Sequence, residues 1–306
     1  MAFDTFAVGV VDFEGTKLRS AFDVNENPNV TLFRRHHSGR ISPIYSVTSQ
    51  IAPKVTFNTL ECGIVLALLG PIGRALANTI VYYTRCKQVT RSTGADHLKS
   101  TLTSGIAVPR TLSWGGGVSA WTLGVELLPD SVDGLTAPIA YGTAALPALA
   151  VIPETFTGGK FVVNSGAGDV EVDCWQNASL DFGVTANPVF HKGLPAPVRS
   201  AVQTATPSFR ISNLNPTDRT TFGQFGTRVV SSTLYLRKNE TAAGLTPTRV
   251  LDATAQHVKI SMLGGIIYPG QTTAPETGDD TQEIMIAPEE NDATAAIVIT
   301  TGVAIP

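Results

Sequence analysis

The sequence predicts a mainly β protein made of two tandem β-sandwich or barrel-like domains, the first with one flanking α-helix. Three observations lead to this prediction. Short segments rich in β-branched and aromatic residues recur along the chain and end at Gly, Pro or Asn. A block of the first half returns in the second half. Only one stretch places apolar residues at helical spacing between a cap and a stop signal.

The repeat is clearest in residues 97–109 (HLKSTLTSGIAVP) and 257–269 (HVKISMLGGIIYP), which share six of thirteen positions at an offset of 160. Three further matches extend it at offsets of 152 to 159: Tyr83 and Arg85 with Tyr235 and Arg237, 43–60 with 197–214, and 127–134 with 286–293. The small changes in offset indicate loop insertions between two copies of one domain. We expect the copies to occupy residues 1–150 and 151–306.

The first copy is predicted to contain strands and one helix. Its strand-like segments are PKVTFNT (53–59), NTIVYYTR (78–85), HLKSTLTSG (97–105) and VSAWTLGVEL (118–127). The stretch TLECGIVLALLG (59–70) begins with a threonine suited to an N-cap and ends with a glycine. It is therefore the predicted helix.

The second copy is predicted to consist of strands alone. These are GKFVVNSG (159–166), PSFRISN (207–213), VSSTLYLRK (230–238), QHVKISML (256–263) and TAAIVITTG (294–302). At the position of the helix it carries LNPTDRTTFGQFG (214–226), with one proline and two glycines. Such residues favour a loop or one short turn.

Composition points to an assembled protein rather than an isolated one. Of 306 residues, 43% are hydrophobic and only 15% are charged, well below the usual quarter, so part of the outer surface is predicted to contact other subunits. The formal net charge of −3 excludes a basic footprint for tight nucleic-acid binding. Three cysteines without a C-x-x-C motif argue against a disulfide scaffold or zinc site and favour buried thiols.

No membrane insertion is predicted. The N-terminus lacks the basic region and cleavage site of a signal peptide. The longest apolar run, residues 62–73, is too short to cross a bilayer and contains Pro71.

The repeated histidine and lysine are the candidate site. On a strand, alternate residues share a face, so Val258, Ile260 and Met262 are expected to face the core. The candidate positions are expected on the opposite, polar face: His97, Lys99 and Thr101 in copy one, and His257, Lys259 and Ser261 in copy two. A channel lining or subunit contact is the favoured interpretation. A merely solvated face is the alternative, and catalysis is disfavoured.

No catalytic residue, cofactor site or metal site is predicted. The GGK at 158–160 lacks the spacing of a phosphate-binding loop. No G-x-S-x-G nucleophile elbow occurs. Apart from the repeated His97 and His257, no metal-ligand pattern appears in both copies.

The order of these features resembles the major tail tube protein family of long-tailed bacteriophages. The resemblance rests on ISPIYSVTSQIAPKVTFNTLECGIVLALLG (41–70), NTIVYYTRC (78–86) and HLKSTLTSGIAVPRTLSW (97–114), and on the same order of segments in the second copy. The resemblance extends over most of the chain and occurs in both copies. It rests on the order and residue types of the segments rather than on a diagnostic motif.

The resemblance implies a virion structural role. Rings of such domains stack into a tube through which double-stranded DNA leaves the capsid, without sequence-specific binding. With two domains per chain, a homotrimer would supply a pseudo-hexameric ring. The implied partners are the chain itself and other tail proteins, namely the tape measure, terminator and distal tail or baseplate proteins. Assembly would occur in the host cytoplasm.

Two alternatives stay open at this stage. One is another tail, baseplate or capsid-decorating protein that does not polymerise. The other is a carbohydrate- or receptor-binding β-sandwich module, which predicts clustered exposed aromatic residues on one face. Trp114, Trp121 and Trp175 are too far apart in the sequence to establish such a cluster.

Overall fold

The fold is mainly β, as predicted, with 64% of residues in strands and 3% in helix. The structure is a computed structural model that describes residues 5–36, 38–39, 41–86, 97–117, 119–148, 153–172, 175–191, 193–213, 226–240, 248–273, 281–291 and 293–306. Within these ranges α1 is the single helix. The predicted boundary near residue 150 and most of the predicted loop at 214–226 lie outside the described residues.

The first half contains ten strands and the helix. Their bounds are β1 (Thr5–Phe13), β2 (Thr16–Leu18), β3 (Phe22–Asn27), β4 (Val30–His36), β5 (Pro43–Ile51), β6 (Lys54–Thr59), α1 (Cys62–Leu69), β7 (Arg74–Cys86), β8 (His97–Trp114), β9 (Thr122–Pro129) and β10 (Ile139–Ala144).

The second half contains thirteen shorter strands. Their bounds are β11 (Thr155–Asn164), β12 (Asp169–Glu171), β13 (Trp175–Asp181), β14 (Val184–Val189), β15 (Arg199–Ala205), β16 (Ser208–Asn213), β17 (Thr227–Arg228), β18 (Ser231–Glu240), β19 (Thr248–Arg249), β20 (His257–Leu263), β21 (Ile266–Thr273), β22 (Thr281–Ala287) and β23 (Ile297–Val303).

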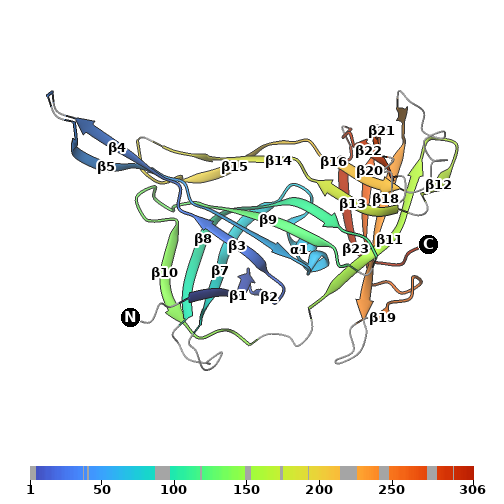
Figure 1. Cartoon of the computed structure of the whole chain (residues 1–306), viewed down its shortest axis with the longest axis horizontal. Helices are drawn as coiled ribbons and strands as arrows, with labels where there is room; N and C mark the ends of the chain where they lie inside the picture. Colours follow the sequence, from blue (N-terminus) through green and yellow to red (C-terminus); the bar gives the residue numbers. More distant parts are fainter. Residues whose placement is uncertain are drawn as a thin grey trace.

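Both halves use the same strand order in two sheets (Figure 1). We name as sheet I the strands β2–β1–β7–β8–β10 and their counterparts β12–β11–β18–β20–β23. Sheet II comprises β3–β6–β9–β8 and the counterparts β13–β16–β22–β21. The long strand β8 belongs to both sheets of its half, whereas its counterpart is divided into β20 and β21.

The passage from sheet I to sheet II occurs at a glycine in each half. Gly105 and Gly265 both have positive φ, +135° and +92°. A Cβ atom at Gly105 would overlap the carbonyl oxygen of Leu128, and one at Gly265 would overlap that of Ala287. Only glycine allows the backbones to approach so closely. This explains why the repeated phrase retains Gly at an offset of 160.

Strand registers repeat along with the strand order. Ile106 lies opposite Leu128, and Ile266 lies opposite Ala287. Both ladders then shift register directly after a proline, Pro109 or Pro269. The β4–β5 and β14–β15 hairpins likewise share one irregularity, between residues 31 and 32 and between residues 185 and 186. The two halves therefore agree in fine detail of pairing.

One predicted correspondence is wrong by a single residue. Lys99 lies opposite Tyr82, and Lys259 lies opposite Tyr235. The offset between β7 and β18 is therefore 153, so Tyr82, rather than Tyr83, corresponds to Tyr235. The difference matters because a shift of one residue moves a strand side chain to the other face of the sheet.

The halves are joined edge to edge. Residues 111–114 of β8 pair with residues 178–181 of β13 in an antiparallel ladder. Sheet II is therefore one continuous sheet, to which the first half contributes four strands and the second half contributes five when the short β17 is included. One hydrophobic cluster also spans both halves, so their cores are continuous.

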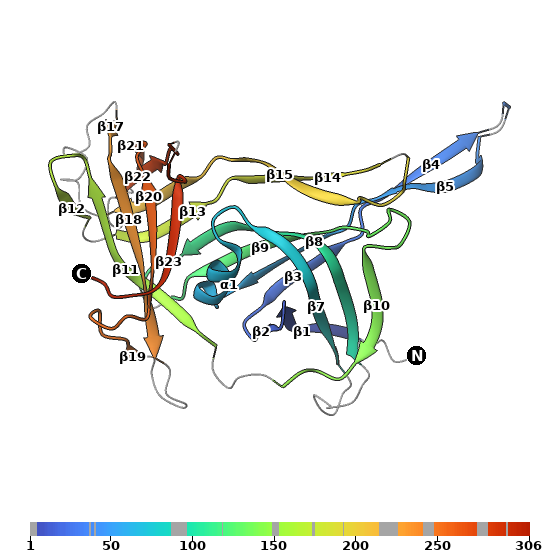
Figure 2. The same ribbon diagram turned by 180° about the vertical axis from the view of Figure 1, so that it is seen from behind.

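Helix α1 packs at this junction, next to β11 and β23 of the second half (Figure 2). A Cβ atom at Gly63 would lie 2.7 Å from the Phe156 ring, which shows how tightly the helix contacts β11. Cys62 is buried there, and burial, aided by Glu154, raises the pKa of its thiol. Cys174 and the side chain of Cys86 lie outside the described residues.

Two long hairpins leave the sandwich in the same way but have different surroundings. Hairpin β14–β15 lies along the first half, whereas β4–β5 projects away from the body of the molecule (Figure 1). All seven residues of β4 are exposed, including Val30, Leu32 and Phe33. Large apolar side chains exposed together on one projecting element are unusual for a monomeric protein.

Candidate functional site

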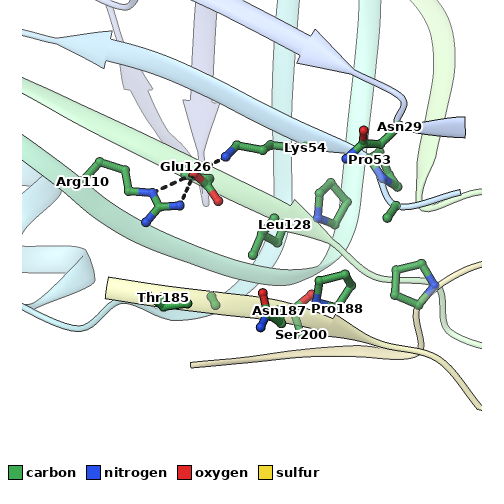
Figure 3. Close-up of a pocket in the computed structure, with 14 residues that line it drawn as sticks. Asn29, Pro53, Lys54, Arg110, Glu126, Leu128, Thr185, Asn187, Pro188 and Ser200 are labelled. Carbon is green, nitrogen blue, oxygen red and sulfur yellow. Dashed lines mark hydrogen bonds and ion pairs between the residues drawn. The ribbon is translucent and has the colours of Figure 1, made fainter. Parts of the chain in front are cut away.

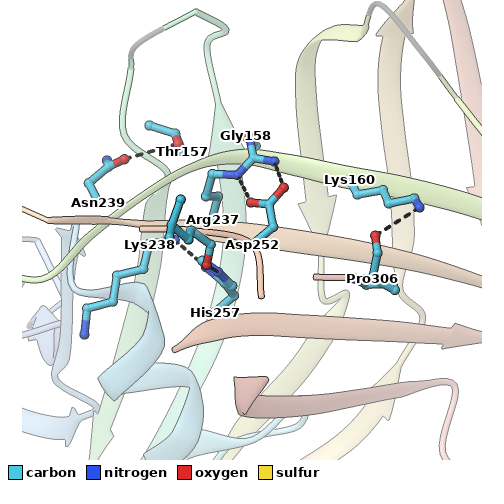
Figure 4. A network of polar contacts seen from close by, with 10 residues as sticks. Thr157, Gly158, Lys160, Arg237, Lys238, Asn239, Asp252, His257 and Pro306 are labelled. Carbon is cyan, nitrogen blue, oxygen red and sulfur yellow. Dashed lines mark hydrogen bonds and ion pairs between the residues drawn. The ribbon is translucent and has the colours of Figure 1, made fainter. Parts of the chain in front are cut away.

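The predicted polar-face position is wrong for the two histidines. His257 is completely buried. Its Nδ1 accepts a hydrogen bond from the backbone N–H of Lys238 (3.0 Å), so its Nε2 donates to the carbonyl of Leu251 at 3.1 Å (Figure 4). The ring therefore ties β20 to β18 and to the segment after β19. His97 is also buried, with 2% of its surface exposed.

The remaining predicted residues do lie on the outer face of sheet I. Lys99, Thr101, Lys259 and Ser261 are half-buried, while Val258, Ile260 and Met262 are in the core as expected. Each lysine lies across the ladder from a tyrosine that is 8% exposed, Tyr82 or Tyr235. Burial raises the pKa of both phenols. The sequence alignment matched Tyr83, rather than Tyr82, with Tyr235. It therefore did not show that this Lys–Tyr pair occurs in both halves.

A shallow cavity of about 450 Å³ lies beside Lys259 on this face. Its lining contains charges of both signs, and Lys160 pairs with Glu171 at 3.2 Å. Lys160 also donates to the carbonyl of Pro306 at 3.2 Å (Figure 4). Its amine is thus occupied by the protein itself.

A second cavity of about 310 Å³ lies at the junction of the halves (Figure 3). Within it the buried Glu126 carboxylate contacts Lys54 and Arg110, both at 2.6 Å. Arg110 also donates to the carbonyl of Val184, at the start of hairpin β14–β15. The single carboxylate holds both cations, which leaves the cluster with a net charge of +1, and the cluster fastens the hairpin, which is a structural role.

The outer face of sheet II is polar and its charges are paired. Along β6 and β16 buried residues alternate with accessible ones. The accessible positions on β6, β8, β13 and β16 include Thr56, Asn58, Thr111, Ser113, Ser179, Ser208 and Ser212. Besides the Lys54–Glu126–Arg110 cluster, Arg210 pairs with Glu283 at 3.0 Å. The three cations of these pairs therefore each contact a carboxylate, although they share only two carboxylates.

The three tryptophans come together, although they are far apart in the sequence. The Trp114 ring lies 4.6 Å from that of Trp175 and 6.0 Å from that of Trp121, measured between centroids. Trp121 is fully buried, Trp114 is 9% exposed and Trp175 is half-buried. The cluster belongs to the core at the junction, so it does not form the exposed aromatic face expected of a carbohydrate-binding module.

Sheet II ends in a free edge on each side. Among the described residues β3 pairs only with β6, and β21 beyond Ile267 pairs only with β22. Asn25, Asn27 and Gln271 on these edges are exposed. Free edges present unpaired backbone N–H and C=O groups, which other strands can bind. Sequence reasoning missed them because edges depend on topology, not on local pattern.

Hairpin β14–β15 shows how such a joint is reinforced. The Ser200 backbone N–H and hydroxyl both donate to the Asp130 carboxylate, at 2.6 and 2.7 Å. The Ser131 N–H donates to the carbonyl of Pro197 at 2.7 Å. The hairpin of the second half is thus hydrogen-bonded to the turn after β9 in the first half. Burial raises the pKa of Asp130, although the bonds from Ser200 act against that shift.

No protein-family model matches the chain, and no curated protein matches its sequence. Helix α1 has eight residues, and the described part of the chain holds no helix that meets the length and hydropathy of a membrane span. Nor do three or more His, Cys, Asp or Glu side chains gather as a metal site within the described ranges.

Proposed function

We propose that the protein is a virion structural subunit whose rings stack into a bacteriophage tail tube, a conduit for DNA. The observation that carries the proposal is the edge-to-edge joint between two equivalent halves. A joint of this kind relates one half to the next head to tail, so it can be repeated by further copies. The free edges of sheet II provide the means for such repetition.

The proposed ring places sheet II around the channel. Edge-to-edge strands that continue from chain to chain close into a barrel, which removes the aggregation hazard of free edges. The polar outer face of sheet II, on which Lys54, Arg110 and Arg210 each contact a carboxylate, would then line the channel. Passing DNA would meet few free cations, which suits a conduit that must not hold phosphates. In this arrangement Lys99 and Lys259, on sheet I, face away from the channel.

The projecting hairpin supports an assembled state. Val30, Leu32, Phe33, Tyr45 and Val47 are 42–54% exposed on a single arm. A second arm of identical register is already packed in each chain. We propose that β4–β5 packs equivalently once chains assemble.

Negative-stain electron microscopy of the purified chain tests the proposal. We expect rings with a central hole that stack into tubes as protein concentration rises. Particles that stay monomeric across salt and concentration would contradict it. Rings that never stack would instead favour a non-polymerising tail, baseplate or capsid-decorating protein.

A further inference from the structure

We propose that the contact between neighbouring chains copies the joint between the two halves of one chain, residue for residue. Its partner is therefore a second copy of this chain, bound through the β3 edge of one copy and the β21 edge of the other. The inference deepens the proposed function and rests on it for ring closure. It adds the surfaces and the strand register.

The register follows from the pairings within the chain. In the internal joint Asp181 lies opposite Thr111, Leu180 opposite Leu112, and Ser179 opposite Ser113. The ladders around β13 and β3 correspond at an offset of 154, and those around β8 and β21 at 160. The corresponding pairs between chains are Asn27 with Gln271, Glu26 with Thr272, and Asn25 with Thr273.

The required edges are available. These positions on β3 and β21 carry no other strand on their outer side among the described residues. The paired stretches 25–27 and 271–273 contain no proline, so no backbone N–H that the ladder needs is missing. The N–H of Gln271 donates to the Glu283 carboxylate at 3.4 Å and does not take part. One bond of the internal joint is lost, because Phe182, which donates to Arg110, corresponds to Pro28.

The projecting hairpin supplies the second part of the contact. Ser200 and Asp130, which bind each other within the chain, correspond to Ser46 and Glu289. A serine and a carboxylate have thus been kept at both places, although Ser46 lies on the exposed arm and the exposed Glu289 pairs with Arg228 at 2.8 Å within its own chain. In the next chain Ser46 would donate to Glu289, as Ser200 does to Asp130.

The hairpin's backbone groups also have counterparts. The Ser131 N–H donates to Pro197 within the chain, and the corresponding groups are the N–H of Glu290 and the carbonyl of Pro43. The apolar pair Leu112–Leu180 is replaced by Thr272 and Glu26. The contact between chains is therefore more polar than the internal joint. This difference fits a surface that is exposed in the free chain and buried only on assembly.

Disulfide trapping tests the register directly. Opposite residues of an antiparallel pair have Cα atoms about 4.5–5.5 Å apart, within the range that a disulfide spans. We expect the double variant Asn27→Cys/Gln271→Cys, oxidised in the assembled state, to give a ladder of covalent oligomers. In the proposed homotrimeric ring this ladder stops at three chains. The equivalent internal pair, Thr111→Cys/Asp181→Cys, should form its disulfide within one chain and serves as the geometric control.

A displaced pair and single variants control for chance contacts. Asn25→Cys/Gln271→Cys is displaced by two residues, where Cα atoms are about 7–8 Å apart, and should crosslink at least tenfold less. Each single variant alone should give no ladder, because its cysteine has no partner. A mixture of Asn27→Cys chains with Gln271→Cys chains should give dimers and nothing longer.

The outcomes separate this inference from the proposed function. Equal crosslinking of the aligned and displaced pairs, or none by the aligned pair within visible tubes, would overturn the copied joint and leave the tube intact. Aligned crosslinks in particles that never stack would uphold the joint while contradicting the tube.

As a second measurement, Ser46→Ala and Glu289→Gln should each raise the concentration needed for assembly several-fold, and the two effects combined should not add. Unchanged assembly in both would count against the hairpin contact.

Discussion

At the scale of residues, the buried His257 is a structural linker. Each ring nitrogen of His257 forms a hydrogen bond with a backbone group. The side chain thereby supplies partners to an N–H and a carbonyl that would otherwise lack them. Strand alternation correctly places Val258, Ile260 and Met262 in the core. It misplaces His257 because the first residue of a strand is covered by whatever segment precedes it, here the region of Leu251.

Replacing His257 should therefore destabilise the fold. His257→Ala leaves the part-buried Lys238 N–H and Leu251 carbonyl without their side-chain partner, which costs about 1–3 kcal/mol. Lys259→Ala, two residues along on the accessible face, should change the stability by no more than about 0.5 kcal/mol. Urea denaturation midpoints of the two variants measure the difference. Equal midpoints would contradict the linking role of the histidine.

Tyr141 provides a prediction about pH. Burial, together with its hydrogen bond to the Glu26 carboxylate, raises the pKa of this phenol to about 12. The folded state therefore favours the neutral phenol. Its contribution to stability is complete below the unfolded value near 10 and disappears as pH rises toward 12.

Alkaline titration followed by near-ultraviolet absorbance checks this expectation. Tyr141→Phe should remove a component that ionises near pH 12, and Glu26→Gln should move that component to lower pH. An unaltered alkaline titration in both variants would refute the assignment.

At the scale of elements, the helix and nine of the 23 strands in the described residues were predictable from the sequence. Helix α1 occupies residues inside the predicted 59–70 and ends at the predicted stop, Gly70. The predicted cap is wrong, because Glu61 rather than Thr59 is the N-cap and it makes no side-chain cap hydrogen bond. The division of one repeated strand into β20 and β21 was not predictable, since the same glycine lies within the continuous β8 of the first half. The hairpins escaped prediction because their exposed strands lack the alternation that burial on one face imposes.

The two sheet-crossing glycines should be sensitive to any side chain. Gly105→Ala and Gly265→Ala each force a Cβ atom against a carbonyl oxygen at positive φ, and each should cost at least about 1–3 kcal/mol. Gly142→Ala on β10 is the matched control, because nothing lies within 4 Å of the added carbon. Thermal unfolding would measure all three, and a control as unstable as the crossing variants would be the contrary result.

The two hairpins should respond differently to shortening. Removing the outer part of β4–β5 leaves the isolated chain folded, because the arm projects from the body (Figure 1), but should abolish assembly. Ser200→Ala in β14–β15 breaks the bond to buried Asp130 and should lower the stability of the monomer by about 1–3 kcal/mol. Circular dichroism melting and sedimentation velocity would distinguish these effects. Normal assembly of the shortened chain would contradict the proposed role.

At the scale of the whole molecule, the repeat was readable in the sequence and the joint was not. Six matching positions revealed that one unit occurs twice, because duplication keeps turn residues such as Gly105 and Gly265. Edge pairing between β8 and β13 involves ordinary strand residues, and nothing in Thr111 or Asp181 marks them as partners. The side of the sandwich that carries Lys99 was likewise fixed by topology alone.

Charge reversal of both repeated lysines tests which face lies outside the channel. Lys99→Glu combined with Lys259→Glu changes the outer face of sheet I, away from the proposed joints and lining. Rings and tubes should therefore still form, with the altered charge on their exterior, as electron microscopy and electrophoretic mobility would measure. Loss of ring formation would place these lysines at a subunit contact instead.

The unlike free edges of sheet II make each chain resemble a monomer with two different end groups. Growth by such a monomer is directional, and its products are either closed cycles or open filaments. A chain whose β21 edge is blocked can still bind through β3, so a small fraction of it acts as a chain stopper. The degree of polymerisation would then be set by the ratio of blocked to intact chains, which makes the size of the assembly adjustable in the test tube.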